Sequence, residues 1–127
     1  MIALDASVLI AHLSPGDVHH AAATGILLDA SPGSMLVHTL TLAEVLVGGV
    51  KIGSGASMRD DLRAAGIGTA AHDVDEPLRL AELRAASGLK LRDCCVLDIA
   101  IRNHASLATF DDALAVAARR RDIAVLP

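Results

Sequence analysis

Aromatic residues are almost absent from this sequence, which contains Phe110 but no Trp and no Tyr. Any core must therefore be built from Ala, Val, Leu and Ile, and a hydrophobic content of 53% over 127 residues is ample for one compact domain. The shortage also excludes a platform of stacked aromatic side chains, one common way of holding single-stranded nucleic acid. A contact with RNA or DNA would have to depend on charge, shape and metal.

Cysteine and long hydrophobic runs are scarce as well. Cys94 and Cys95 are the only cysteines, and because they are adjacent they offer neither a disulfide framework nor a zinc-binding CxxC motif. We expect both to be small buried apolar residues. No apolar run reaches the roughly 18 residues that a membrane-spanning helix needs, and the N-terminus has no basic signal-peptide segment. We therefore expect a single cytoplasmic domain over residues 1–127 that does not associate with membranes.

A net positive charge is missing too, since the formal net charge is −4. This argues against a non-specific nucleic-acid coat but not against a nuclease, because Lys90 and Arg92 flank Asp93 and could form a basic rim around an acidic centre. A second basic run, Arg119–Arg121, ends the last long helix, where cations complement the helix dipole. The alternative is that this run binds phosphate groups of a nucleic acid.

Short apolar segments alternate with helical ones along the whole chain. We expect strands at 1–4, 35–38, 67–71, 106–109 and 123–126. Helices are expected at 7–13, 19–30, 41–47, 57–65, 77–86, 92–104 and 112–121, with Gly48-Gly49 ending the third. Strands that alternate with helices indicate an α/β fold with a central parallel sheet of four or five strands covered on both faces.

Four carboxylates stand at positions that this fold could bring together. Asp5 closes the first apolar run, Asp111 follows the strand at 106–109, and Glu44 and Asp93 lie on helices. Ligands of open parallel sheets bind beyond the carboxyl ends of the strands. Hard cations such as Mg²⁺ and Mn²⁺ prefer oxygen ligands, and like-charged carboxylates gather at a cost unless a cation or protons neutralise them. This set therefore suggests a divalent-metal site.

Each of these carboxylates also has a structural interpretation. Asp5, Asp93 and Asp111 could each cap the helix that follows, and Glu44 could close a capping box with Thr41. Together they favour the metal site, because Asp5 and Glu44 are expected to be buried and no Lys or Arg lies near either in sequence.

Further polar residues surround this set. Ser7 and Thr109 could hydrogen-bond locally to a helix start, or orient a carboxylate or a metal-bound water. Asp112 competes with Asp111, and we place it as a supporting residue or as a ligand of a second metal ion. Asp98 is left out of the site, because it lies about 140° around the helix from Asp93 and Arg102 stands at the favourable i+4 position.

Histidine offers no further metal motif. The six histidines show neither HExxH nor another spacing typical of zinc, so we expect surface or packing roles for all of them. An aspartyl phosphatase would need Asp-x-Asp after the first strand, where this chain has Ser7.

The acidic segments resemble the PIN-domain ribonucleases, most closely the VapC-like toxins of toxin–antitoxin pairs. Residues 1–7 (MIALDAS) are similar to the family's opening strand with its Asp-x-Ser turn, and residues 39–46 (TLTLAEVL) to the segment with its glutamate. Residues 89–96 (LKLRDCCV) and 108–111 (ATFD) are similar to its two remaining aspartate motifs. Arg92 stands where the family often has Pro, and Asp98 where an apolar residue is common.

The resemblance implies a Rossmann-like PIN fold, a three-layer sandwich, with RNA cleavage that depends on Mg²⁺ or Mn²⁺ held by Asp5, Glu44, Asp93 and Asp111. It also implies a homodimer and inhibition by a small VapB-like antitoxin. We expect an Arg-bearing segment of that antitoxin to cover the four carboxylates, because guanidinium pairs with carboxylate in two-pronged geometry. The alternative is a non-catalytic PIN-fold module that binds a partner or serves as a regulatory subunit.

Overall fold

Five short strands form a parallel sheet at the centre of the computed structural model, which describes all 127 residues. Their spatial order is β3-β2-β1-β4-β5. The strands are β1 (Ile2–Leu4), β2 (Met35–Val37), β3 (Ile67–Thr69), β4 (Ser106–Ala108) and β5 (Val125–Leu126). The expected parallel α/β sheet of four or five strands is confirmed.

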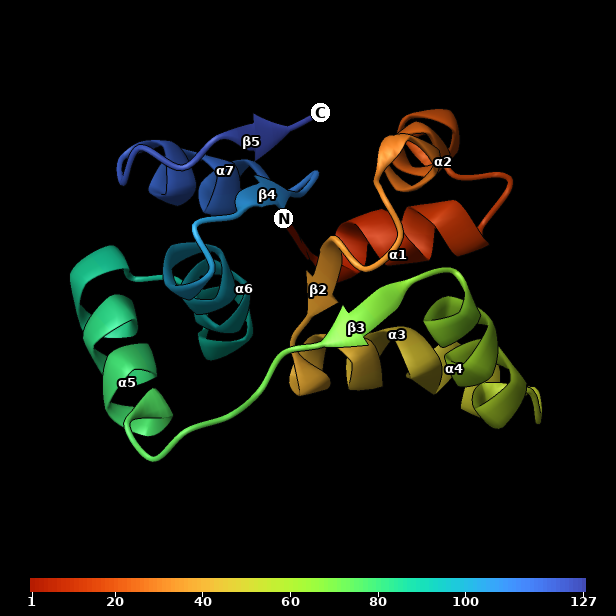
Figure 1. Cartoon of the computed structure of the whole chain (residues 1–127), viewed down its shortest axis with the longest axis horizontal. Coiled ribbons are helices and arrows are strands. Elements are labelled where there is room, and N and C mark those ends of the chain that lie inside the picture. The colour runs from red at the N-terminus through yellow and green to blue at the C-terminus, as the bar shows by residue number, and fades with distance from the viewer.

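Seven helices cover the two faces of this sheet. They are α1 (Ala6–Leu13), α2 (His20–Asp29), α3 (Thr39–Lys51), α4 (Gly55–Ala64), α5 (Glu76–Ser87), α6 (Leu91–Arg102) and α7 (Asp112–Arg119). Figure 1 shows α1 to α4 on one side of the strands and α5 to α7 on the other. The chain steps outward from β1 to β3 and then returns to the other side of β1 through β4, so the order of the strands reverses between β1 and β4. None of the helices is long and apolar enough to cross a bilayer.

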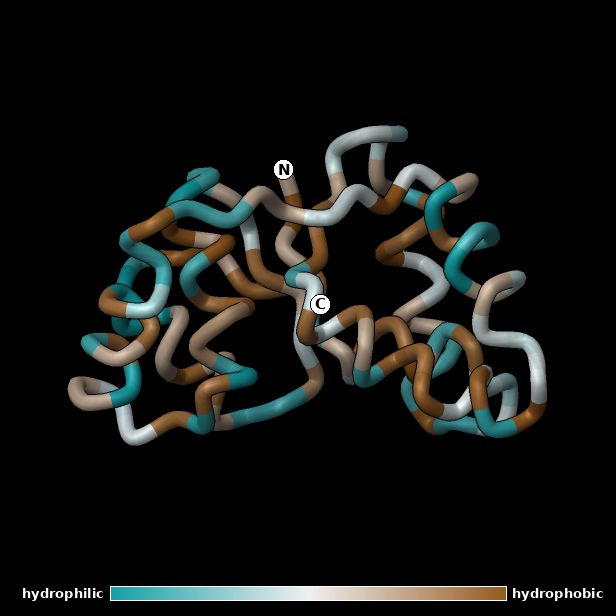
Figure 2. Tube along the Cα trace, turned by 90° about the horizontal axis from the view of Figure 1, so that it is seen from below, coloured by the Kyte–Doolittle hydropathy of each residue, from teal (hydrophilic) through white to brown (hydrophobic).

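Successive residues of the inner strands point into two different cores. Ala3 and Leu107 belong to the cluster under α6 and α7, whereas Leu4 and Ala108 belong to the cluster under α1 to α4. This alternation is the two-residue period of a strand buried on both faces. The tube in Figure 2 shows helices on both sides of the central strands, and the strands themselves are largely coloured as hydrophobic.

All twelve expected elements are present, but α3 does not end at Gly48-Gly49. The helix continues to Lys51. At Gly49 the helix lies close to α4: a Cβ atom there would stand 3.0 Å from both Sδ and Cε of Met58, whereas one on Gly48 would meet nothing within 4 Å. The sequence-based prediction of a helix end at Gly48-Gly49 is wrong, and Gly49 instead marks a contact between α3 and α4.

The joint between α5 and α6 is held by a buried ion pair. Arg79 donates from Nε to Oδ1 of Asp98 at 2.9 Å and from Nη2 to Oδ2 at 3.2 Å, and it also binds Asp73. These hydrogen bonds raise the pKa of Arg79 further above its ordinary value. The expected partner Arg102 is 4.0 Å from Asp98 and contributes little. Asp98 thus anchors α5, a role that helix spacing alone did not predict.

We predict that Asp98→Asn lowers the free energy of unfolding by about 1–3 kcal/mol, because it removes charge-assisted hydrogen bonds from a side chain that is 3% exposed. Urea denaturation followed by circular dichroism measures the loss. The control is Asp60→Asn, whose pair with Arg59 is exposed and worth about 0–1 kcal/mol. Equal stability of the two variants would contradict this role for Asp98.

Candidate functional site

A small cavity opens at the carboxyl edge of the sheet, where the order of the strands reverses between β1 and β4. Open parallel sheets bind their ligands at this point. The cavity measures about 220 Å³ and is lined by all four predicted carboxylates together with polar and apolar neighbours: Asp5, Glu44, Asp93, Asp111, Ala6, Ser7, Ile10, Thr41 and Arg92. The structure therefore brings the four acidic residues together from four separate segments.

Asp5 is fixed in this cavity by hydrogen bonds to both of its oxygens. Oδ1 accepts the backbone N–H of Ala6 at 2.8 Å, so Asp5 is the N-cap of α1, as one interpretation of the sequence proposed. Oδ2 accepts the hydroxyls of Ser7 and Thr109, each at 2.7 Å. The helix-capping role and a place in the acidic cavity are compatible, because Oδ1 accepts one hydrogen bond and retains a lone pair, although both lone pairs of Oδ2 are used by the two hydroxyls.

The same two hydroxyls also fix the chain that follows β4. Ser7 Oγ accepts the N–H of Phe110 at 3.1 Å, and Thr109 Oγ1 accepts the N–H of Asp111 at 2.9 Å. Asp111 then caps α7 by accepting the N–H of Leu114 on Oδ1 at 2.9 Å. The predicted orienting role of Ser7 and Thr109 thus has a geometric basis, and Oδ2 of Asp111 accepts no hydrogen bond.

Among the four carboxylates, Asp93 is the one whose pKa is clearly raised by its surroundings. It lies in the first turn of α6, whose N-cap is Lys90, so the capping role considered for Asp93 is wrong. Burial, followed by the charges of Asp5 and Asp111, raises the pKa of Asp93 above its usual range, although Arg92 and Lys90 oppose the shift. The cavity therefore holds negative charge that the protein does not fully neutralise.

Glu44 is positioned differently from the sequence interpretation. The helix begins before Thr41, and His38 caps it by accepting the N–H of Leu40 on Nδ1 at 3.0 Å, so no capping box forms. Arg92 Nη1 lies 3.7 Å from Glu44 Oε2, and both side chains are partly exposed. The expectation that Glu44 is buried is wrong, because its side chain is 31% exposed, and α6 supplies a basic group across the cavity although none lies near Glu44 in sequence.

The remaining predicted residues lie outside this cavity. Asp112 is exposed at the start of α7 and lines a separate groove of about 790 Å³ that also contains Arg120 and Arg121. Asp98 is occupied by Arg79, as described above. The supporting role given to Asp112 is therefore not matched by its position, whereas the exclusion of Asp98 agrees with its position.

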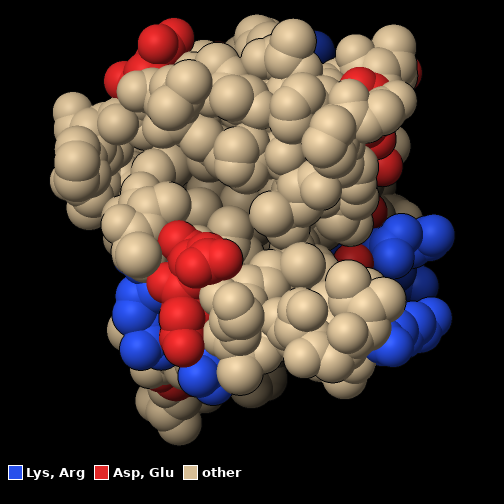
Figure 3. Space-filling model, turned by 90° about the vertical axis from the view of Figure 1, so that its right-hand side faces the viewer, with Lys and Arg blue, Asp and Glu red and all other residues tan.

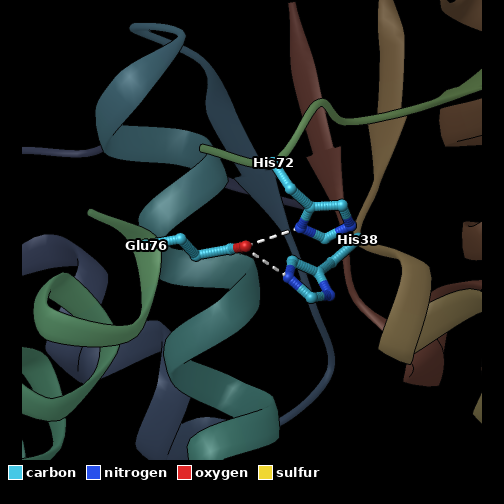
Figure 4. Close-up of side chains that lie close together, drawn as sticks. All are labelled: His38, His72 and Glu76. Carbon is cyan, nitrogen blue, oxygen red and sulfur yellow. Dashed lines mark hydrogen bonds and ion pairs between the residues drawn. The ribbon is translucent and has the colours of Figure 1, made fainter. Parts of the chain in front are cut away.

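Sequence reasoning missed a second polar cluster. His38, His72 and Glu76 form the one group of three or more His, Cys, Asp or Glu residues in which one potential ligand atom from each residue lies within 4.8 Å of the others (Figure 4). His38 Nε2 is 2.8 Å from Glu76 Oε1, and His72 Nδ1 is 2.5 Å from Glu76 Oε2. The assignment of all histidines to surface or packing roles overlooked this group. The i,i+4 spacing of His72 and Glu76 was a weak signal, since His72 precedes the helix.

Comparison with protein families matches residues 2–120 to the PIN domain. Comparison with curated protein sequences gave no match. Among solved structures, the chain is similar to a toxin–antitoxin complex from Klebsiella pneumoniae, with a TM-score of 0.71 and 25% identity over 87% of this chain and 85% of the other.

Two more distant structures share the fold. VapC20 of Mycobacterium tuberculosis, a toxin that cleaves the sarcin-ricin loop, has a TM-score of 0.75 and 14% identity over 92% of this chain and 95% of its own. FitAcB of Neisseria gonorrhoeae has a TM-score of 0.73 and 20% identity over 100% of this chain and 97% of its own.

The geometry predicts opposite effects for two substitutions that both remove a negative charge. Asp5→Asn lowers the free energy of unfolding by about 1–3 kcal/mol, because an amide cannot accept on both sides and leaves a buried donor unpaired. Asp93→Asn leaves metal-free stability unchanged or raised, because it removes a repelled carboxylate. Urea denaturation in the presence of a chelator compares them, and an Asp93→Asn protein less stable than Asp5→Asn would contradict this assignment.

Proposed function

Because the chain belongs to the PIN-domain family, we propose that it is a divalent-metal-dependent endoribonuclease and the toxin of a toxin–antitoxin pair. The observation that carries the proposal is the cavity lined by Asp5, Glu44, Asp93 and Asp111 at the reversal of strand order. Four carboxylates on separate segments would repel one another without a cation, so their convergence supports a metal-binding role over a purely structural one.

The donors present fit Mg²⁺ or Mn²⁺. Every candidate ligand is a carboxylate oxygen, Oδ2 of Asp111 has no competing hydrogen bond, and the raised pKa of Asp93 reports negative charge in need of a counter-ion. Such an ion would supply Lewis-acid chemistry, lowering the pKa of a bound water and neutralising charge on the scissile phosphate. We assign its binding to Asp5, Asp93 and Asp111, with Glu44 as the fourth carboxylate.

The surrounding side chains would orient these groups and the substrate. Ser7 and Thr109 hold Asp5 in one rotamer through its Oδ2 atom. Arg92, more than half exposed beside Glu44, provides positive charge at the rim where a phosphodiester would approach. RNA is the proposed substrate, in single-stranded loops, because bases there are accessible whereas the A-form major groove is closed to side chains.

We predict that Asp93→Asn reduces metal-dependent RNA cleavage by at least about 10²-fold, since a metal ligand is lost while the fold is retained. The measurement is cleavage of a structured RNA by purified protein with Mg²⁺ or Mn²⁺, and with a chelator as the blank. The matched control is Asp112→Asn, which removes an exposed carboxylate outside the cavity and keeps full activity. Wild-type cleavage by folded Asp93→Asn protein would overturn the site, and no cleavage by the wild type would favour the non-catalytic module.

We propose that the antitoxin binds along an apolar groove that runs into the acidic cavity. This groove is lined by Ile10, Leu13, Ser14, Glu44, Val45, Gly48, Gly49, Ile52 and Met58, and it shares Ile10 and Glu44 with the cavity. Figure 3 views the molecule from the side of α1 to α4, and most of that face is uncharged. An apolar segment in the groove would therefore lead an Arg side chain directly to the carboxylates. A homodimer, as the family resemblance implies, completes the proposal.

Ile52→Asp tests the groove, because Ile52 is 76% exposed and lies outside the acidic cavity. A charge there should weaken binding of the antitoxin at least about tenfold by leaving a desolvated carboxylate in an apolar interface, while RNA cleavage stays at the wild-type rate. Binding is measured with the protein encoded beside this gene, and Val74→Asp is the control, since Val74 is an exposed aliphatic residue outside the groove. Equal binding by both variants would place the antitoxin elsewhere.

A further inference from the structure

We propose that His38, His72 and Glu76 form a second metal site, the histidine site, which binds a transition-metal ion such as Zn²⁺. The three residues come from different parts of the fold. His38 follows β2, His72 lies between β3 and α5, and Glu76 is the first residue of α5. Their side chains converge, with both imidazole rings facing one carboxylate (Figure 4).

The donor set differs in chemistry from the acidic cavity. Two imidazole nitrogens and one carboxylate oxygen are ligands that suit Zn²⁺ and neighbouring transition metals, whereas an all-oxygen set suits Mg²⁺ and Mn²⁺. None of the three residues lines the acidic cavity. Three protein ligands also leave one position of a tetrahedral ion for water.

The ligand atoms are already close to the separations that an ion requires. All lie within 4.8 Å of one another, and a tetrahedral ion with bonds of about 2.0–2.1 Å would place its ligands roughly 3.3 Å apart. The shortest separations are 2.8 Å and 2.5 Å, between each ring and Glu76. For metal entry, the two ring–carboxylate separations must lengthen by about 0.5 and 0.8 Å, and the longest separation must shorten by at most about 1.5 Å.

The surroundings of His72 and Glu76 favour metal binding. The second nitrogen of His72, Nε2, lies 3.0 Å from Thr39 Oγ1. To ligate through Nδ1, the ring must move the proton that it donates to Glu76 over to Nε2, where Thr39 Oγ1 can accept it and orient the ring as partners of metal-bound histidines do. Glu76 is ready to act as an anion: burial opposes its ionisation, but hydrogen bonds from His72 and His38 outweigh this and lower its pKa.

His38 must exchange one hydrogen bond when an ion binds. Its Nδ1 accepts the N–H of Leu40, so the proton of the neutral ring stays on Nε2, which donates to Glu76. To ligate through Nε2, the ring moves this proton to Nδ1 and releases the Leu40 N–H. Leu40 is partly exposed at the start of α3, so water can take that donor.

Binding of Co²⁺, whose visible absorption is strong in tetrahedral sites and weak in octahedral ones, tests the proposal on the full chain. Wild-type protein should bind one Co²⁺ with a tetrahedral spectrum, and one Zn²⁺ should displace it. His72→Ala and Glu76→Gln should each lower the affinity for Co²⁺ by more than about tenfold, because loss of a residue that only supports a ligand can already cost that much. His72 is exposed, so the alanine variant should fold, and circular dichroism checks this.

Two controls separate the histidine site from other sources of binding. His104→Asn removes a histidine elsewhere, at a left-handed position (φ 49°) that Asn tolerates, and should bind Co²⁺ like the wild type. Asp93→Asn alters only the acidic cavity and should also keep the tetrahedral spectrum. The proposal is overturned if the wild type shows no tetrahedral Co²⁺ spectrum, if His72→Ala binds as tightly as the wild type, or if Asp93→Asn abolishes binding. None of these results depends on RNA cleavage.

Discussion

The arrangement of the acidic cavity depends on the hydrogen bonds that the carboxylate of Asp5 accepts. One oxygen caps α1 and the other receives hydroxyls from Ser7 and Thr109. The Asp5–Thr109 bond joins residues 104 apart in sequence, and it ties the carboxyl ends of β1 and β4 together where the strand order reverses. A crevice opens at such a point in every doubly wound sheet. In this chain the Asp5 side chain lines that crevice and holds its two sides together.

Helix α6 shows how the protein treats buried negative charge in two ways. Residues 94–100 of this helix, Asp98 among them, are all buried and Asp93 is partly buried, so both acids lose hydration that must be replaced. Asp98 receives two hydrogen bonds from Arg79 and is thereby compensated within the fold. Asp93 faces Asp5 and Asp111 instead, and its raised pKa marks a charge without sufficient protein partners. The paired acid stabilises the fold, and the unpaired acid has capacity left for a ligand.

Much of this architecture was predictable because it follows from local periodicity and from general rules for parallel sheets. The PIN-family resemblance is confirmed, and four carboxylates expected at one edge of the sheet line one cavity. What the sequence did not reveal were the partners supplied by distant segments: Arg79 for Asp98, Arg92 for Glu44, and the histidine site. These pairings depend on how helices cross, and a crossing angle leaves no periodic signal in one sequence.

Helix α3 connects the two proposed metal sites mechanically. His38 caps it, and Glu44 lies six residues further along the chain, a rise of about 9 Å along the helix. An ion in the histidine site would hold the start of α3 against α5, and α5 is itself fixed to α6 by the pair of Arg79 with Asp98. Glu44 on α3 and Asp93 on α6 would then be held from both sides of the cavity. The histidine site is thus placed to stabilise the geometry of the acidic cavity without contributing a ligand to it.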